Sequence, residues 1–174
     1  LDRYTSGDLI INNKSTKNFK DRDWDAYRNY SVGFVFQNFN LIGRTSALRN
    51  VELPMLYAGV PAEQRTKRAK ELLSKVGMES RMNHMPNELS GGQQQRVSIG
   101  RALMNAPSVM LADEPTGNLD SKNSQEIVEL LKMSNKKYDQ TLIIITHDEN
   151  IALQADRIIA IEDGRITRDE RTRN

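Results

Sequence analysis

The sequence predicts an α/β fold in which helices cover both faces of a parallel sheet, and two observations carry this prediction. Apolar runs such as Val32–Phe36 and Thr141–Thr146 are continuous rather than alternating, which is typical of strands buried on both faces. Longer segments with apolar residues at helical spacing separate such runs, as in strand–helix–strand units. With 174 residues, the chain is expected to form a single domain, 1–174, with a sizeable core.

The first part of the chain contains two expected strands and one expected helix. Asp8–Asn12 holds consecutive apolar residues and predicts a short strand. Asp21–Asn29 is charged and places Trp24 and Tyr27 at helical spacing, which favours a short amphipathic helix. Val32–Phe36 is a compact apolar run and predicts a buried strand.

The middle of the chain has a helical pattern. Thr45–Tyr57 is expected to be a helix that bends or breaks at Pro54, because proline removes a helical hydrogen bond. Pro61–Val76 begins with proline, repeats apolar residues at helical spacing and is followed by Gly77. Proline at the start and glycine after the end are typical of a helix with these bounds.

The last part alternates regularly between helices and strands. Gln93–Met104 and Ser121–Lys137 carry apolar faces at helical spacing, whereas Ser108–Ala112 and Thr141–Thr146 are short apolar runs. The remaining expected elements are a short helix at Ile151–Ala155, a strand at Arg157–Ile161 and a turn at Asp163-Gly164.

Composition excludes several classes of protein. The net charge is +2, from 25 basic and 23 acidic residues spread along the chain, so no nucleic-acid partner is expected. Cysteine is absent, which excludes disulfides and thiolate metal sites and fits a reducing compartment. The longest apolar runs fall far short of the ~18 residues that a membrane span needs.

The stretch LSGGQQQR, Leu89–Arg96, has two interpretations. Ser90 and Gln93 fit the capping-box pattern, so the stretch could be an ordinary helix start. It could equally be an anion site, because a helix N-terminus offers unpaired N–H groups and the positive end of the helix dipole. Gly91 and Gly92 would then leave room for a phosphate, and the Ser90 hydroxyl would add a donor.

Two carboxylates follow the expected strand at 108–112, at the end where ligands of open α/β sheets bind. Successive strand residues point to opposite faces, so the two acids are expected to differ in role. We expect Asp113 to hold Mg²⁺, which prefers oxygen ligands, and Glu114 to take the proton from an attacking water. The alternative is a pair of solvated acids at the start of a turn.

His147 and Gln37 stand at the ends of two further expected strands. If these strands neighbour the one that ends at Asp113-Glu114, all these side chains face one crevice. His147 could otherwise be a structural histidine, and Gln37 an ordinary loop residue.

Together these stretches resemble the motifs of the ATP-binding-cassette (ABC) ATPase domain, in family order and at family spacing over essentially the whole chain. The segments EPTGNLDS, FQNFNLI and NVELPMLYAGV are most similar to those of the branch that serves lipoprotein release, macrolide-type export and antimicrobial-peptide resistance. The matching segments are Gln37 for the Q-loop, Leu89–Gln93 for the signature, Val109–Glu114 for Walker B, Gly117–Asp120 for the D-loop and His147 for the switch histidine.

The resemblance implies a P-loop NTPase fold of the RecA type, with an inserted α-helical subdomain at residues 38–88. It implies ATP and Mg²⁺ as cofactors, with Asp113 and Gln37 at the metal. It implies that Glu114, His147 and Gln37 act in hydrolysis.

The resemblance also implies two partners. One is a second ABC ATPase domain in head-to-tail arrangement, whose nucleotide contacts Ser90, Gly91, Gly92, Gln93 and Asp120 of this chain. The other is a membrane-spanning permease subunit, contacted through residues 38–88, which would place the chain in the cytoplasm as a peripheral protein on the inner face of the cell membrane.

One family motif is absent from the sequence. No GxxxxGK followed by Ser or Thr occurs in it, and the resemblance implies such a Walker A loop, with the first strands, before Leu1. We expect a truncated domain rather than a degenerate one, because every later motif is intact, and we expect the chain alone to be inactive.

Other function classes remain open at this point. A non-catalytic regulatory or truncated ABC module would fit the absent Walker A, although intact Glu114 and His147 argue against it. ABC-type ATPases of DNA repair insert long coiled coils or zinc modules, for which the sequence between Gln37 and Leu89 leaves no room and no cysteine. A translation factor would carry two cassettes in one chain.

Overall fold

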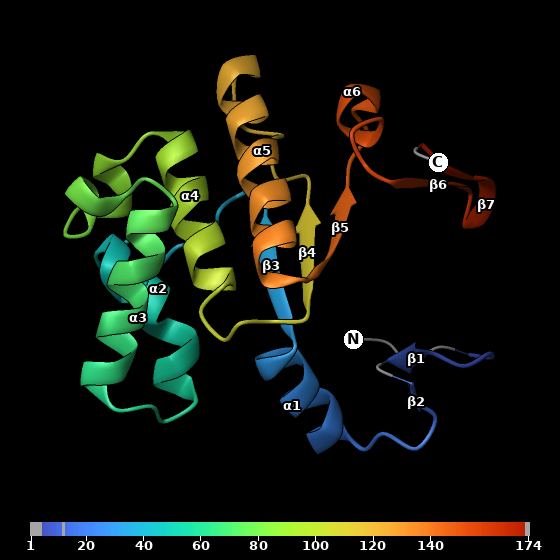
Figure 1. Ribbon diagram of the computed structural model, residues 1–174, viewed down its shortest axis with the longest axis horizontal. Helices are drawn as coiled ribbons and strands as arrows, with labels where there is room; N and C mark the ends of the chain where they lie inside the picture. The colour runs from blue at the N-terminus through green and yellow to red at the C-terminus, as the bar shows by residue number, and fades with distance from the viewer. Residues whose placement is uncertain (1–4, 12, 173–174) are drawn as a thin grey trace.

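The centre of the structure is a three-stranded parallel sheet. A computed structural model of the chain describes residues 5–11 and 13–172. Its strands β3 (Val32–Phe36), β4 (Val109–Asp113) and β5 (Thr141–Ile145) lie in the order β3-β4-β5, with their last residues level. In Figure 1 the three strands run the same way and stop at one edge. The predicted α/β fold with a parallel sheet is confirmed.

Two helices pack on this sheet. α4 (Gly91–Ala102) contacts β3, α5 (Ser121–Tyr138) contacts β5, and the helices contact each other. They stand side by side in Figure 1, and both begin at the end of the sheet where the strands stop. On the face toward these helices Met110 and Ala112 are buried, whereas Ile143 on the opposite face is 46% exposed. The apolar runs predicted burial on both faces, and the described part of the chain buries one face more fully than the other.

Every element between residues 38 and 88 is helical. α2 (Ala47–Tyr57) and α3 (Ala62–Lys75) pack against each other and against α4. Two 3-10 helices, η1 (Glu79–Arg81) and η2 (Pro86–Glu88), then lead the chain to α4. The apolar residues of α2, α3 and α4 share one core with those of β3 and β4, so this helical segment is fixed to the sheet by packing.

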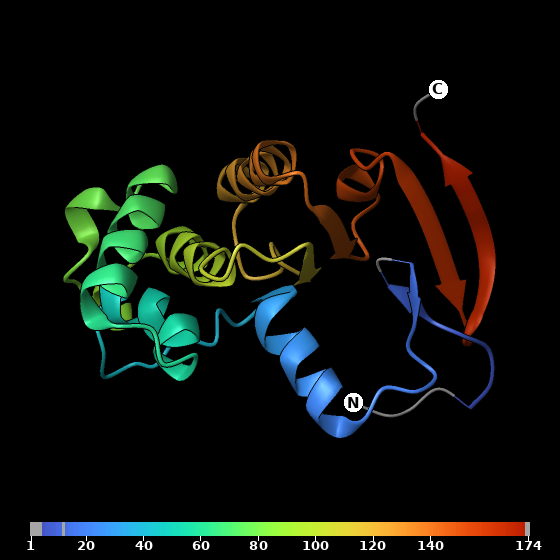
Figure 2. The same ribbon diagram turned by 60° about the horizontal axis from the view of Figure 1, so that its bottom comes forward.

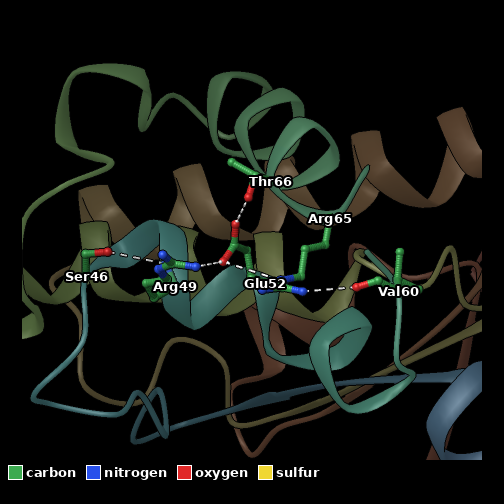
Figure 3. A network of polar contacts seen from close by, with 6 residues as sticks. All are labelled: Ser46, Arg49, Glu52, Val60, Arg65 and Thr66. Atoms are coloured by element: carbon green, nitrogen blue, oxygen red, sulfur yellow. Dashed lines mark hydrogen bonds and ion pairs between the residues drawn. The ribbon is translucent and has the colours of Figure 1, made fainter. Parts of the chain in front are cut away.

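A buried carboxylate joins α2 to α3. Glu52 of α2 is 2% exposed; Arg49 donates to it at 2.9 Å, and the Thr66 hydroxyl of α3 also donates to it. The guanidinium Nε of Arg65 lies 3.9 Å from the same carboxylate, and its Nη1 donates to the Val60 carbonyl at 3.0 Å (Figure 3). Because a buried charge is unfavourable unless it is paired and hydrogen-bonded, this network holds the two helices in one relative position.

Two antiparallel strand pairs lie outside the central sheet. β1 (Ile10–Ile11) pairs with β2 (Lys14–Ser15), and β6 (Arg157–Glu162) pairs with β7 (Arg165–Arg171). Figure 2 shows the β6–β7 pair at one side of the molecule, and β6 forms no ladder with β5 among the described residues. Ile161 of β6 is 66% exposed, so this strand presents apolar side chains outside the core.

Several elements differ from the expected ones in their bounds or course, and three of the differences have local explanations or limits. α4 begins at Gly91 rather than Gln93, because Ser90 caps it. α2 continues through Pro54, where one helical hydrogen bond is lost without ending the helix. The expected strand at 8–12 is reduced to β1, and Asn12, like residues 1–4 before it, lies outside the described residues.

The remaining helices are α1 (Asp21–Tyr30), which contacts β3, and the short α6 (Glu149–Ala152). α1 agrees closely with the expected helix at 21–29, whereas α6 begins and ends earlier than the expected helix at 151–155 and shares only two residues with it. None of the helices in residues 5–11 and 13–172 combines the length and the apolar character needed to cross a membrane.

Candidate active site

The carboxyl ends of the three parallel strands bring four predicted residues to one edge of the sheet. Gln37 directly follows β3, Asp113 ends β4, Glu114 comes next, and His147 stands shortly after β5. Because the last residues of the strands are level, these four residues share the edge where open α/β sheets bind ligands. We call it the site edge.

Glu114 leaves β4 in a left-handed backbone conformation. Its φ is 45°, which is uncommon for a residue other than glycine. Its N–H still donates to the Ile145 carbonyl of β5 at 2.9 Å, so the peptide stays tied to the sheet. The pleat predicted that Asp113 and Glu114 would point to opposite faces. In the structure β4 ends at Asp113, and Glu114 turns away in the left-handed conformation instead of continuing the pleat. The surrounding contacts must hold this strained conformation in place.

The Glu114 carboxylate contacts His147 twice. Its Oε1 accepts the His147 backbone N–H at 3.1 Å and lies 2.6 Å from the imidazole Nδ1. An ionised carboxylate only accepts hydrogen bonds, so Nδ1 carries the proton in this pair. Glu114 is partly shielded, with 23% of its side chain exposed, whereas His147 is 86% exposed. The pair fits a general base held in orientation by a second group.

The hydrogen bond to Glu114, followed by the charge of that carboxylate, raises the pKa of His147 above its ordinary 6.5. Because the pKa is higher in the folded chain, the pair stabilises the fold below pH ~6.5, and this contribution is lost as the pH rises through the folded pKa. In Glu114→Gln the charge is gone, so the pKa of His147 should fall toward its ordinary value. An NMR titration of the ring protons measures the change, with His84, which does not contact Glu114, as an internal control. An unchanged pKa of His147 would contradict the pairing.

The turn after β4 holds the Gln37 side chain. Gln37 Nε2 donates to Asn118 Oδ1 at 3.4 Å, and Asn118 Nδ2 donates to the Gln37 carbonyl at 3.1 Å and to Asn38 Oδ1 at 2.9 Å. A Cβ on Gly117 would lie 2.6 Å from Gln37 Nε2, so a larger residue there would displace the amide from this position. Asn118 was not among the individually predicted site residues. Its one signal was an amide side chain within the Gly117–Asp120 motif.

Ser90 starts α4 with a capping box. The Gln93 N–H donates to Ser90 Oγ at 3.3 Å, and the Ser90 N–H donates to Gln93 Oε1 at 3.0 Å. The N–H groups of Gly91 and Gly92 belong to the first turn and have no acceptor within the helix. The helix-start interpretation is therefore confirmed, and it leaves N–H groups of the kind that an anion site uses.

The signature glycines also have a packing role within the chain. A Cβ on Gly92 would lie 2.6 Å from Asn123 Oδ1, and a Cβ on Gly91 would lie 3.2 Å from Leu119 Cδ2. Asp120 caps α5, accepting the Asn123 backbone N–H at 2.9 Å and side-chain amide at 2.7 Å, and these bonds lower the pKa of Asp120. The start of α4 thus packs directly on the start of α5. These close approaches give the two glycines a packing role beside the phosphate access inferred from sequence.

The signature and the site edge are not joined directly. In the described part of the chain, Ser90 and Gln93 hydrogen-bond to each other, and neither side chain bonds to Gln37, Glu114 or His147. The structure therefore brings together the four strand-end residues and places the signature at the start of a neighbouring helix.

The site edge fits a magnesium ion that is held partly by a ligand. No group of three or more acidic or histidine side chains able to hold a metal occurs in residues 5–11 and 13–172. Mg²⁺ commonly takes only one or two protein carboxylates when phosphates and waters complete its shell. Asp113 is exposed at the end of β4 and could supply that carboxylate. Gln37 directs its amide nitrogen to Asn118, which leaves its oxygen as the atom suited to a cation.

Comparison with known proteins agrees with this arrangement. Residues 1–117 match the family described as ABC transporter. The chain is 51% identical over 171 residues to an uncharacterized ABC transporter ATP-binding protein of Thermotoga maritima, covering 98% of this chain and 73% of that protein. It is 49% identical over 169 residues to the macrolide export ATP-binding/permease protein MacB of Vibrio parahaemolyticus, covering 97% of this chain and 26% of that protein.

Solved structures give the same result. A dimeric, post-hydrolysis structure of the ATP-binding cassette MJ0796 of Methanocaldococcus jannaschii, bound to ADP and Pi, superimposes with a TM-score of 0.85 at 45% identity, covering 99% of this chain and 76% of that chain. For cbiO1 of Clostridium perfringens, part of the ABC transporter complex cbiONQ, the TM-score is 0.88 at 29% identity, covering 97% of this chain and 67% of that chain. The chain therefore belongs to the ABC transporter family and is one of its ATP-binding cassettes.

Proposed function

We propose that the chain is the ATP-hydrolysing part of an ABC transporter, in which dimer closure on ATP powers export or release of a substrate through a membrane-spanning partner. The observation that carries the proposal is the Glu114–His147 pair, with 2.6 Å between Oε1 and Nδ1, at the edge where ligands of such sheets bind. A fixed carboxylate there can take the proton of a water that attacks the terminal phosphate of ATP.

Each residue of the site edge has a role in this proposal. Glu114 is the general base, and His147 orients it. Asp113 holds Mg²⁺, with the Gln37 amide oxygen as a second contact. Bound Mg²⁺ supplies charge neutralisation at the phosphates. Gln37 is kept in reach by the turn that contains Asn118.

Ser90, Gly91, Gly92 and Gln93 are proposed to contact the nucleotide of a second ATPase domain, with Asp120 nearby. Two features support this arrangement. The first-turn N–H groups of α4 suit a phosphate, and in the part of the chain that the structure describes no hydrogen bond joins the signature side chains to the site edge. The related MJ0796 cassette, bound to ADP and Pi, is a dimer.

The membrane-spanning partner is proposed to dock on the helical subdomain, residues 38–88. A groove of 390 Å³ runs between β3 and α2, and Phe36, Pro54 and Arg101 help to line it. Tyr57, also in the lining, is 80% exposed, so it offers a large aromatic side chain to a partner. The groove reaches the residue before Gln37, which would connect partner docking to the site edge. This role places the chain at the inner face of a cell membrane, with no nucleic-acid partner.

The test uses the completed domain, meaning this chain together with the Walker A segment that family resemblance places before it. Phosphate release should require both ATP and Mg²⁺. Asp113→Asn should raise the Mg²⁺ concentration needed for half-maximal rate, because the metal loses a charged oxygen ligand. Asp139→Asn is the matched control: Asp139 is an exposed acid just before β5, at the opposite end of the sheet. A wild-type magnesium dependence in Asp113→Asn would contradict the assignment.

A further inference from the structure

A fully buried glutamine lies beneath the site edge. Gln95 of α4 is 0% exposed, and its Nε2 donates to the carbonyl of Phe36 at 3.2 Å and to that of Pro115 at 2.6 Å. Because both acceptors are carbonyls, the amide nitrogen is the atom that must face them. Its Oε1 is buried and has no hydrogen-bond partner in the described part of the chain.

An apolar side chain of similar length would pack at this position without burying an unpaired carbonyl oxygen. Gln95 lies on the buried stripe of α4, with Gly92 before it and Ile99 and Ala102 after it at helical spacing. An unsatisfied polar atom in a core destabilises the fold. The two hydrogen bonds from the NH₂ group to backbone carbonyls therefore explain why an amide occupies this position.

These two carbonyls flank the residues of the proposed site. The Phe36 carbonyl belongs to the peptide bond that leads into Gln37, and Pro115 directly follows Glu114. Phe36 and Asp113 form the last pair of the β3–β4 ladder, so Gln95 bridges the two strands just beyond the point where their own hydrogen bonds stop.

The bridge supports the contacts made by the turn after β4. The Gly117 N–H donates to the Glu114 carbonyl at 3.1 Å, and Asn118 bonds to Gln37 across the gap between the strands. Glu114 is held on its other side by β5, through its N–H to Ile145. Among residues 5–11 and 13–172, Gln95 is the one residue whose side chain hydrogen-bonds to both the Phe36 and the Pro115 carbonyl, and its loss would remove this link between the end of β3 and the turn.

We propose that Gln95 is a positioning residue of the ATPase site, which rests on the proposed function. It fixes the separation of Gln37 and Glu114 by bonding the backbone beside each of them. Because it stands on α4, it also ties that separation to the helix that the signature residue Ser90 caps. It touches neither nucleotide nor metal itself.

Gln140 provides a matched control within the same sheet. It is 6% exposed, its Nε2 donates to the Pro107 carbonyl at 2.6 Å, and its Oε1 is also buried without a partner in the described residues. It precedes β5, at the end of the sheet opposite the site edge. The same substitution at the two positions therefore makes the same chemical change in the same kind of environment.

The experiment compares Gln95→Met and Gln140→Met in the completed domain. Both should lower the melting temperature, because both lose buried hydrogen bonds. Gln95→Met alone should lower kcat, by roughly tenfold to a hundredfold, because small misplacements of catalytic groups have effects of that size. The KM for ATP should change little. Gln95→Asn keeps the amide but withdraws it by one methylene. It should also lower kcat with little change in KM, and it replaces Gln95→Met in the experiment if that variant does not fold.

Wild-type protein and Glu114→Gln are assayed alongside. A wild-type protein that does not hydrolyse ATP contradicts the proposed function. A wild-type protein that hydrolyses ATP, with Gln95→Met at an unchanged kcat, overturns the positioning role alone. Equal losses of kcat in Gln95→Met and Gln140→Met also overturn it, because they would show a general loss of stability.

Discussion

Replacing Glu114 by glutamine should abolish ATP turnover in the completed domain while ATP still binds. The amide keeps the size of the carboxylate and can still accept the His147 hydrogen bonds, but it cannot take a proton from water. General-base catalysis typically contributes ~10²–10⁴-fold, so kcat should fall by about that factor. Phosphate release measures turnover, and calorimetric titration with Mg-ATP measures binding.

The control for this substitution is Glu129→Gln. Glu129 is an exposed glutamate on α5, bonded to Gln125 and remote from the site edge. Its replacement should leave both turnover and binding unchanged. Turnover near the wild-type rate in Glu114→Gln would show that another group, or no protein group, takes the proton.

Ser90→Arg should impair hydrolysis without weakening ATP binding by an isolated subunit. The bulky cation would fill the space at the start of α4 and remove the hydroxyl, so a phosphate of a second domain could not approach the first-turn N–H groups. Removing a single preorganised donor at a reacting group typically costs ~10²–10³-fold in kcat, and a loss of that order is expected here. Subunit binding is measured by calorimetry at a concentration where the protein is monomeric.

Loss of the helix cap needs its own control, because a missing N-cap destabilises a helix by about 0.5–2 kcal/mol. Ser46 caps α2 in the same way, accepting the Arg49 N–H at 3.3 Å, the distance found between Ser90 and Gln93. Ser46→Arg should therefore reduce stability to a similar extent and leave hydrolysis intact. Equal losses of hydrolysis in both variants would remove the support for a nucleotide contact at Ser90.

Local patterns in the sequence predicted most of the fold. The bounds of β3 agree fully, because a continuous apolar run stops at the polar Gln37. α3 was bounded by Pro61 and Gly77, whose backbone preferences mark helix ends. The strand-end residues of the site edge could be predicted too, since parallel strands deliver their next residues to one edge.

Features that depend on contacts distant in sequence could not be predicted. The left-handed Glu114 is tied to β5 through its N–H, and the side chain that closely approaches Gly92 is that of Asn123, on another helix. The role of Gln95 was missed although a polar residue on the apolar stripe of α4 was visible in the sequence. Only the fold shows that its amide meets Phe36 and Pro115.

The central claim is that each nucleotide is served by Glu114 of one chain and by Ser90 of the other. A mixed dimer of one Ser90→Arg subunit and one Glu114→Gln subunit tests it most directly, with single-turnover phosphate release as the measurement. If the sites form between chains, both lesions fall on the same nucleotide, and the other ATP is hydrolysed. If each site is formed within one chain, each of the two sites carries one substitution, and no phosphate is released at the wild-type rate. Hydrolysis of one ATP of the pair is the predicted result, and loss of both would contradict the head-to-tail arrangement.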